Sequence, residues 1–157
     1  GGKRVSHTIK HPRLQRIFEE IADLPGRQLF SWPDDAGTAH PVDSGRLNAY
    51  LAEITRSKLS AKTFRTWGGT LAAFELADTL PEKERLTLRM MCDAAAARLY
   101  NTPTICRTSY IHPSVLALAD LSSERRFALL GDLKPAPTAG LRGSESRLLS
   151  LLTRKTG

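Results

Sequence analysis

The stretch over residues 60–78 constrains how this 157-residue chain can fold more than any other. Its large apolar side chains recur at the spacing of one helical face, at Phe64, Trp67, Leu71 and Phe74. That period predicts an amphipathic helix with a buried stripe. On another face, Arg65 lies above Gly68 and Gly69. Each glycine costs a helix about 1 kcal/mol relative to alanine. We therefore expect another backbone to pack closely there, with nothing bulky shielding Arg65 on that side.

Further helical patterns follow along most of the chain, and they predict a mainly α fold with at most a short β-hairpin at the N-terminus. The helices are expected at about residues 13–24, 44–55, 81–100, 103–110, 113–119, 122–130 and 145–152. The helix over 81–100 is expected to start from a capping pattern at Thr79 and a proline at Pro81. Residues 1–12 alternate loosely and could form the second strand of a hairpin.

The other expectations concern packing and domain limits. The helix over 44–55 is expected to bury one apolar face, made of Leu47, Tyr50, Leu51 and Ile54. The Pro- and Gly-rich stretch over 27–41 predicts a loop with Phe30 and Trp32 beneath it. Residues 1–132 are expected to form one domain, 133–144 a linker, and 145–157 a terminal helix and tail.

Positive charge is concentrated in three segments that contain no Asp or Glu. The chain has 23 Lys and Arg against 16 Asp and Glu, a formal net charge of +7. The acid-free segments are residues 1–18, 54–74 and 94–119, and each carries at least two Lys or Arg. Clustered cations of this kind suit contacts with the phosphates of a polyanion.

Cysteine and histidine usage points away from metal and disulfide chemistry. Cys92 and Cys106 make no disulfide framework, and the four histidines form no metal-binding pattern. The sequence predicts no cofactor and no metal. No apolar run is long enough to span a membrane and no signal peptide is visible, so we expect a reducing cytoplasm. Because the first residue is Gly and not Met, the chain is expected to be a fragment, a processed product or an expressed piece.

The stretch over residues 101–113, NTPTICRTSYIHP, offers one tyrosine among cations and small hydroxyl residues. It lies in the acid-free segment that also holds Arg98 and Arg107. Phenols ionise only near pH ~10, so Tyr110 needs nearby cations to attack a phosphate at neutral pH. The alternative is an ordinary tyrosine in a helical core.

Two blocks resemble one known family. The sequence TPTICRTSYIHP, over residues 102–113, is similar to the active-site tyrosine motif of the type IB DNA topoisomerases of bacteria and poxviruses. The sequence KTFRTWGGT, over 62–70, is similar to the segment of that family that carries a catalytic arginine. The resemblance extends from the first residues to about residue 130. It implies the C-terminal portion of a helical, recombinase-like catalytic domain whose first catalytic arginine lies upstream of this chain.

The resemblance implies roles for three residues of the two blocks. Tyr110 matches the nucleophile, and Arg65 matches the second catalytic arginine, which clamps a non-bridging phosphate oxygen. Asn101 stands nine residues before Tyr110, where poxvirus members have a phosphate-binding histidine and many bacterial members have Asn. An amide can donate the same hydrogen bond, so Asn101 points to the bacterial branch. Asn101 could also simply cap the preceding helix.

Four further residues have candidate roles. Lys3 is either the family's general-acid lysine or the second lysine of its hairpin pattern, in which case the catalytic one precedes Gly1. Lys62, Arg107 and Thr108 are candidate contacts to the DNA backbone. Any of the three could instead be an ordinary solvated residue.

The function implied is that of a type IB topoisomerase acting on double-stranded DNA. Such an enzyme cuts one strand through a 3′-phosphotyrosyl bond, lets it swivel and reseals it without ATP or metal. We expect a monomer that binds duplex DNA weakly and salt-dependently, and that cleaves it slowly or not at all without its own N-terminal portion. The alternatives are a tyrosine recombinase, which has His where Lys62 stands, a catalytically incomplete DNA-binding domain, and a helical adaptor, which leaves the paired motifs unexplained.

Overall fold

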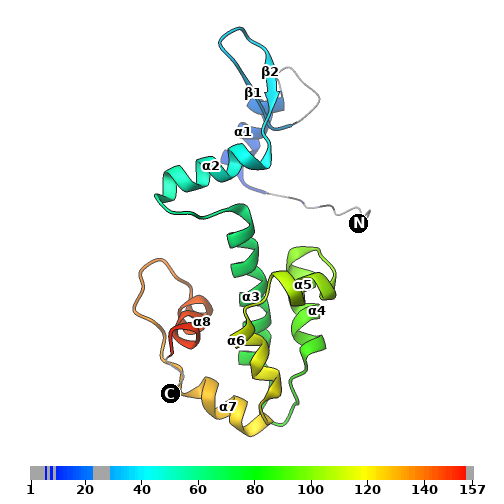
Figure 1. The fold of residues 1–157 in the computed structure, drawn as a ribbon, viewed down its shortest axis with the longest axis vertical. Coiled ribbons are helices and arrows are strands. Elements are labelled where there is room, and N and C mark those ends of the chain that lie inside the picture. The colour runs from blue at the N-terminus through cyan, green and yellow to red at the C-terminus, as the bar shows by residue number, and fades with distance from the viewer. Residues whose placement is uncertain (1–5, 7, 9, 23–28, 155–157) are drawn as a thin grey trace. The chain divides into compact units, whose positions relative to one another are not determined.

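The computed structural model describes residues 6, 8, 10–22 and 29–154. It is mainly helical, which confirms the predicted fold class, and its described part contains one two-stranded sheet (Figure 1). The chain divides into two compact units, an N-terminal unit, Gly1–Ala61, and a C-terminal unit, Lys62–Gly157. No helix in the described ranges is long and apolar enough to cross a membrane.

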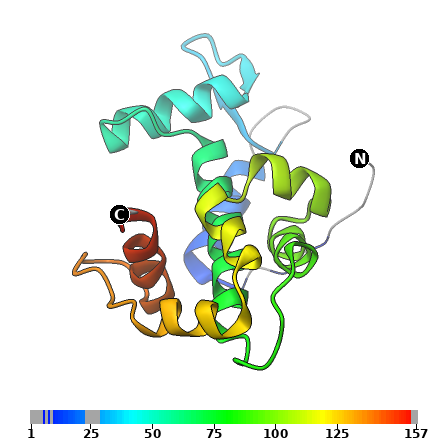
Figure 2. The same cartoon turned by 60° about the horizontal axis from the view of Figure 1, so that its bottom comes forward.

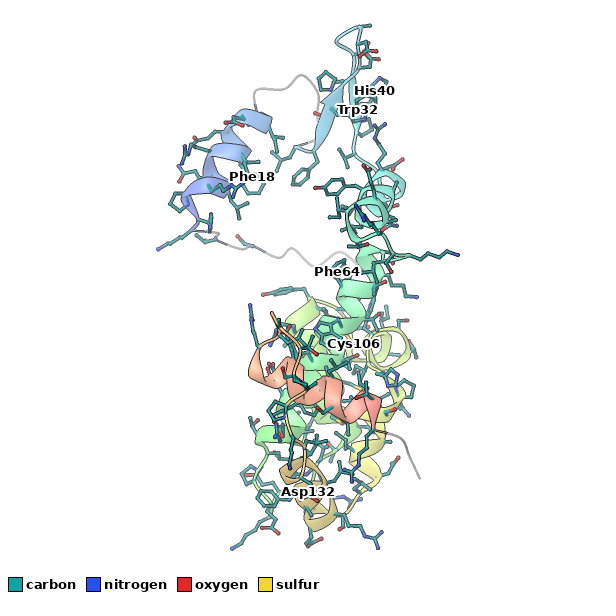
Figure 3. All side chains as sticks on the ribbon, turned by 90° about the vertical axis from the view of Figure 1, so that its left-hand side faces the viewer. Phe18, Trp32, His40, Phe64, Cys106 and Asp132 are labelled. Carbon is teal, nitrogen blue, oxygen red and sulfur yellow. The ribbon has the colours of Figure 1, made fainter. Side chains whose placement is uncertain are left out.

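The N-terminal unit contains two helices and a hairpin, with α1 at Pro12–Ala22, β1 at Ser31–Pro33, β2 at Ala39–Pro41 and α2 at Ser44–Thr55. The strands are antiparallel, with Trp32 opposite His40 (Figure 3). The sequence predicted a loop here, because three-residue strands are too short to show alternation. Asp34 and Gly37 make the turn: Asp34 Oδ1 accepts hydrogen bonds from the N–H groups of Ala36 and Thr38, and Gly37 has φ 79°. The hairpin strand predicted at residues 1–12 falls mostly outside the described residues.

The N-terminal unit buries little apolar surface. The Trp32 ring stacks on His40, with ring centroids 5.0 Å apart, and the Arg46 guanidinium lies 3.8 Å from the centre of the Trp32 ring. No residue in the described part of this unit is buried.

The burial predicted for α2 is wrong. Leu47, Tyr50 and Ile54 are 42%, 58% and 56% exposed, and Leu51 is half-buried. Phe30, expected beneath the loop, is likewise exposed. The helix has the predicted bounds, because periodicity specifies an apolar face. Periodicity does not supply the element that covers that face.

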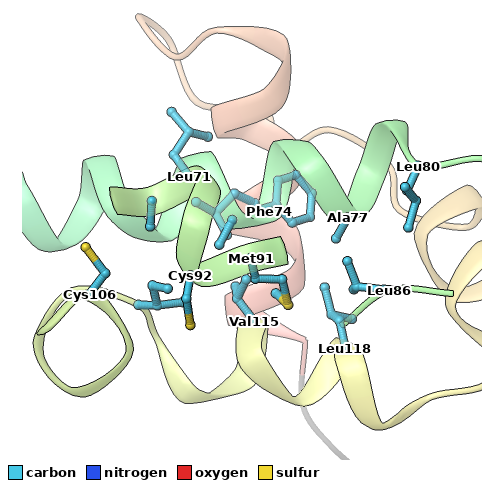
Figure 4. Packing of buried hydrophobic residues seen from close by; sticks show 14 of the residues in the cluster. Leu71, Phe74, Ala77, Leu80, Leu86, Met91, Cys92, Cys106, Val115 and Leu118 are labelled. Atoms are coloured by element: carbon cyan, nitrogen blue, oxygen red, sulfur yellow. The ribbon is translucent and has the colours of Figure 1, made fainter. Parts of the chain in front are cut away.

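The C-terminal unit is built around α3, Ala61–Thr79, which is followed by shorter helices. These are α4 at Leu88–Leu99, α5 at Pro103–Ser109, α6 at Pro113–Leu116, the 3₁₀ helix η1 at Ala117–Asp120, α7 at Ser123–Gly131 and α8 at Gly143–Thr153. Both ribbon views place α8 on one side of α3 and the α4–α5 pair on the other (Figure 2). The core lies between them, with Phe74, Met91 and Val115 fully buried (Figure 4).

The predicted stripe of α3 is buried along only part of its length. Leu71 and Phe74 are buried and Trp67 is half-buried, as expected. Phe64 is 53% exposed, contrary to the prediction. It lies in the first turn of α3, short of the part of the helix where the core residues gather (Figure 3).

The predicted start of α4 at Pro81 is also wrong. The backbone carbonyl groups around Pro81 accept hydrogen bonds from a buried arginine instead. Arg126 of α7 is 1% exposed. Its guanidinium donates hydrogen bonds to four backbone carbonyl oxygens, those of Ala77 at 2.7 Å, Leu80 at 3.0 Å, Pro81 at 2.8 Å and Glu84 at 3.4 Å. The helix begins instead at Leu88, where Thr87 Oγ1 accepts a hydrogen bond from the N–H of Met90.

The terminal helix α8 packs into the same core. Leu148 is fully buried. Arg147 donates to both carboxylate oxygens of Asp78 on α3, at 2.6 and 3.0 Å. The Trp67 indole N–H donates to Glu145 Oε1 at 3.4 Å. Polar contacts therefore join α8 to α3 at both ends of the buried stripe.

Candidate active site

The structure brings Arg65 and Tyr110 together. The Arg65 guanidinium carbon lies 5.1 Å from the centre of the Tyr110 ring, within the range of a cation–π contact. Arg65 Nη2 donates a hydrogen bond to the carbonyl oxygen of Leu99 at 3.1 Å. Arg65 is exposed, Tyr110 is half-buried, and Arg65 makes no ion pair among the described residues. Four of the five guanidinium N–H groups thus remain for an anionic ligand.

Tyr110 is placed at the point where α5 ends. Thr102 caps the start of that helix, with Oγ1 accepting a hydrogen bond from the N–H of Ile105, and Pro103 occupies the first turn. Cys106 faces the core and is fully buried. Tyr110 is the C-cap, with φ −132° and ψ 2°, and its N–H donates to the carbonyl of Cys106 at 3.0 Å. The predicted helix that presents Tyr110 near its end is confirmed.

Close packing against α3 explains one of the two glycines. A Cβ on Gly69 would lie 2.6 Å from the carbonyl oxygen of Tyr110 and 2.9 Å from Leu99 Cδ1. A Cβ on Gly68 would meet only Leu99 Cδ2, at an ordinary 3.7 Å. The predicted close approach of a backbone is confirmed at Gly69. Leu99 covers both glycines. Arg65 itself is exposed, as expected.

Asn101 lies in the link between α4 and α5, directly after Tyr100, which ends α4 in the left-handed conformation at φ 53°. Asn101 is half-buried, and its Oδ1 accepts a hydrogen bond from the N–H of Thr102 at 2.9 Å. Its amide nitrogen has no partner among the described residues. Its donors are therefore available next to the helix that ends at Tyr110.

The other predicted site residues are exposed or lie outside the described residues. Lys62 and Arg107 are exposed, on the first turn of α3 and on α5. Thr108 is exposed and donates its hydroxyl hydrogen bond to the carbonyl of Thr104 within its own helix. Lys3 lies outside the described residues.

The thiols near the site are buried and unreactive in character. Burial raises the pKa of Cys106, a rise that the positive charge of Arg65 partly opposes. Burial also raises the pKa of Cys92, and here the charge of Arg107 acts against it. Within the described ranges, no group of three or more His, Cys, Asp and Glu side chains could hold a metal ion.

Sequence reasoning missed two residues that touch this cluster. Leu99 packs on the glycines and accepts from Arg65, and Thr70 contacts the backbone at Tyr110. Leu99 looks like any apolar residue of α4, and Thr70 like any small polar residue of α3. The position of Thr70 directly after a glycine pair was the one available signal.

Tyr110 thus lies beside an arginine that makes no ion pair among the described residues, on segments of a helical protein that contain no Asp or Glu, an arrangement suited to binding a phosphate. Residues 3–116 match the family model described as the catalytic core of eukaryotic DNA topoisomerase I. The match covers most of the chain, so the chain belongs to this family of type I DNA topoisomerases, which are isomerases that act on DNA. A comparison with curated proteins found no match.

Proposed function

We propose that the chain carries the strand-cleaving chemistry of a type IB DNA topoisomerase of the bacterial or poxvirus kind, with Tyr110 as the nucleophile. The contact between the Arg65 guanidinium and the Tyr110 ring carries the proposal. Because the guanidinium lies beside the ring and keeps unused donors, one phosphodiester group can contact both side chains. The basic, acid-free character of both segments supports a DNA phosphate as the ligand.

In the proposed reaction, Tyr110 Oη attacks the phosphorus of the scissile phosphodiester. A bond forms between Oη and phosphorus, the bond to the 5′ oxygen breaks, and a 3′-phosphotyrosyl link results. Arg65 binds a non-bridging oxygen, and the Asn101 amide donates to the same phosphate as charge develops. The phenol gives up its proton to solvent water, and the leaving 5′ oxygen gains a proton from Lys3, the proposed donor. Reversal reseals the strand after it has swivelled.

The phosphates flanking the cleaved bond are assigned to the exposed residues around the site. Lys62, Arg107 and Thr108 lie on α3 and α5, the two helices that carry Arg65 and end at Tyr110. Contacts of this kind position the duplex and carry no sequence information. We propose that the chain acts as a monomer on double-stranded DNA in the cytoplasm.

The test uses duplex DNA with sulfur in place of the 5′ bridging oxygen at one phosphate and a short strand downstream. A thiolate leaves without a proton, so this substrate does not depend on Lys3, and the short strand diffuses away and traps the adduct. We expect a protein–DNA adduct on a denaturing gel. Tyr110→Phe should abolish it, and Arg65→Lys should slow it about 100-fold, the cost of losing one donor to the transition state.

The chain offers matched controls, because it has three tyrosines. Tyr50→Phe and Tyr100→Phe remove the other two hydroxyls and should leave adduct formation unchanged. Absence of an adduct from the folded wild-type chain at saturating DNA, both alone and with the N-terminal portion of the family's catalytic core supplied, would contradict the proposal and leave a DNA-binding domain. Relaxation of a supercoiled plasmid that has no defined site distinguishes a topoisomerase from a recombinase.

A further inference from the structure

Thr70, in the middle of α3, bonds through its hydroxyl to the backbone that carries Tyr110. Its Oγ1 accepts a hydrogen bond from the N–H of His112 at 3.0 Å. The same oxygen lies 3.4 Å from the carbonyl oxygen of Tyr110, to which it can donate. Thr70 is 3% exposed, so water does not compete for either contact.

This use of a helical threonine differs from the ordinary one. A threonine inside a helix commonly returns its hydroxyl to a carbonyl of the preceding turn. Thr79 of the same helix does so, donating to the carbonyl of Glu75 at 2.8 Å. Thr70 instead reaches a segment 40 residues further along the chain.

Contacts made by neighbouring residues allow the Thr70 hydroxyl to affect the position of Tyr110 relative to Arg65. Gly69 lets the Tyr110 carbonyl approach α3 so closely that no Cβ would fit between them. Ile111, between the two bonded groups, is buried in the core. Arg65 lies one turn before Gly69 on the same helix, and a helix is stiff over that length. The backbone at Tyr110 is therefore located relative to Arg65 by the helix that carries Arg65.

We propose that Thr70 is a positioning residue for the Tyr110 nucleophile. Its hydroxyl holds the backbone over residues 110–112 against α3, so that the Tyr110 ring stays beside the Arg65 guanidinium. The inference rests on the proposed function, because the position of the ring affects a rate only if Tyr110 reacts. A displacement of about 1 Å between reacting groups can cost on the order of 100-fold in rate.

The test compares the wild-type chain with Thr70→Val, Thr70→Ser and Thr79→Val. Valine keeps the volume and removes the hydroxyl, and serine restores the hydroxyl without the methyl group. Thr79→Val is the matched control, the same change on the same helix at a hydroxyl bonded only within α3. The readouts are the rate of adduct formation on the sulfur-bridged duplex at saturating DNA, the dissociation constant for DNA, and amide hydrogen exchange at His112.

We expect Thr70→Val to slow adduct formation 10- to 100-fold, to leave the dissociation constant for DNA within twofold, and to speed exchange at the His112 amide at least tenfold. Thr70→Ser should recover most of the rate, and Thr79→Val should behave as wild type. A general loss of stability would instead weaken DNA binding as well and would not be repaired by serine. A wild-type rate in Thr70→Val overturns this inference while leaving the proposed function standing. No adduct from the wild-type chain, either alone or with the N-terminal portion of the family's catalytic core supplied, overturns both.

Discussion

The two units of the chain contain similar amphipathic helices and bury them to very different extents. In the C-terminal unit, α3 has helices on both sides, and Phe74 is fully covered. In the N-terminal unit, α2 has an equally clear apolar face, yet Tyr50 and Ile54 are more than half exposed. An amphipathic sequence thus specifies a helix, whereas burial depends on which other elements are present to pack against it.

The difference bears on the candidate site, because Arg65, Asn101 and Tyr110 all belong to the C-terminal unit. Their arrangement rests on a packed core. The comparison can be tested directly, because each unit has one tryptophan, Trp32 and Trp67. In a Trp32→Phe background fluorescence follows the C-terminal unit, and in a Trp67→Phe background it follows the N-terminal one.

The largest expected effect is that of Arg126→Met. The change removes the donor shared by four backbone carbonyl oxygens, so we expect the free energy of unfolding of the C-terminal unit to fall by roughly 4 kcal/mol. Urea unfolding followed by Trp67 fluorescence measures it. Arg125→Met, at the exposed neighbouring residue, should change it by less than about 0.5 kcal/mol. Equal midpoints for the two variants would show that these carbonyl bonds contribute little.

The same substitution can be made at a leucine in each unit. Leu148→Ala removes most of a fully buried side chain in α8 and should lower the free energy of unfolding of the C-terminal unit by about 3 kcal/mol. Leu47→Ala, at a residue 42% exposed in α2, should cost less than about 1 kcal/mol. Urea unfolding of each unit, followed by its own tryptophan, gives both values. A larger loss at Leu47 than at Leu148 would reverse the contrast between the units.

Within α3, alanine substitutions at the adjacent residues Gly68 and Gly69 should change the free energy of unfolding in opposite directions. Gly69→Ala forces a methyl group against the Tyr110 carbonyl and should destabilise the C-terminal unit by about 2 kcal/mol. Gly68→Ala meets only ordinary contact and should stabilise it by about 0.5–1 kcal/mol through helix propensity. Thermal unfolding of the two variants decides this, and a stabilised Gly69→Ala would rule out the close approach of the Tyr110 backbone.

The smallest expected effect is a pH dependence in the N-terminal unit. The hydrogen bond with His40, followed by that from the Thr38 N–H, lowers the pKa of Asp34 below its ordinary value of 3.8. A lowered folded-state pKa adds stability that is present above the ordinary value and is lost as the pH falls through the folded value. An NMR titration of the Asp34 carboxyl group should show the low pKa. Asp34→Asn should remove the acid-dependent change in Trp32 fluorescence, and an Asp34 pKa at or above 3.8 would contradict the hairpin geometry.

Local chemistry in the sequence predicted much of the fold, whereas the pairing of Arg65 with Tyr110 was predicted only from the resemblance to a known family. The bounds of α2, the break at Pro103 and the place of Tyr110 at the end of α5 follow from caps, prolines and periodicity. The start of α4 did not follow, because the carbonyl groups of Leu80 and Pro81 bond to Arg126, which comes more than forty residues later. The contact of Thr70 with Tyr110 was hidden for the same reason. Interactions between segments distant in sequence decide both, and no local pattern encodes them.

Both cysteines of the chain lie in the C-terminal unit, at Cys92 and Cys106, and both are buried as free thiols. A thiol-alkylating reagent can therefore mark the protein only when that unit opens. The labelling rate reports how often the half with the candidate site exposes its interior, and unfolding of the N-terminal half leaves the thiols untouched. Retarded labelling in the presence of duplex DNA would give the strength with which DNA holds that half closed, with no cleavage needed.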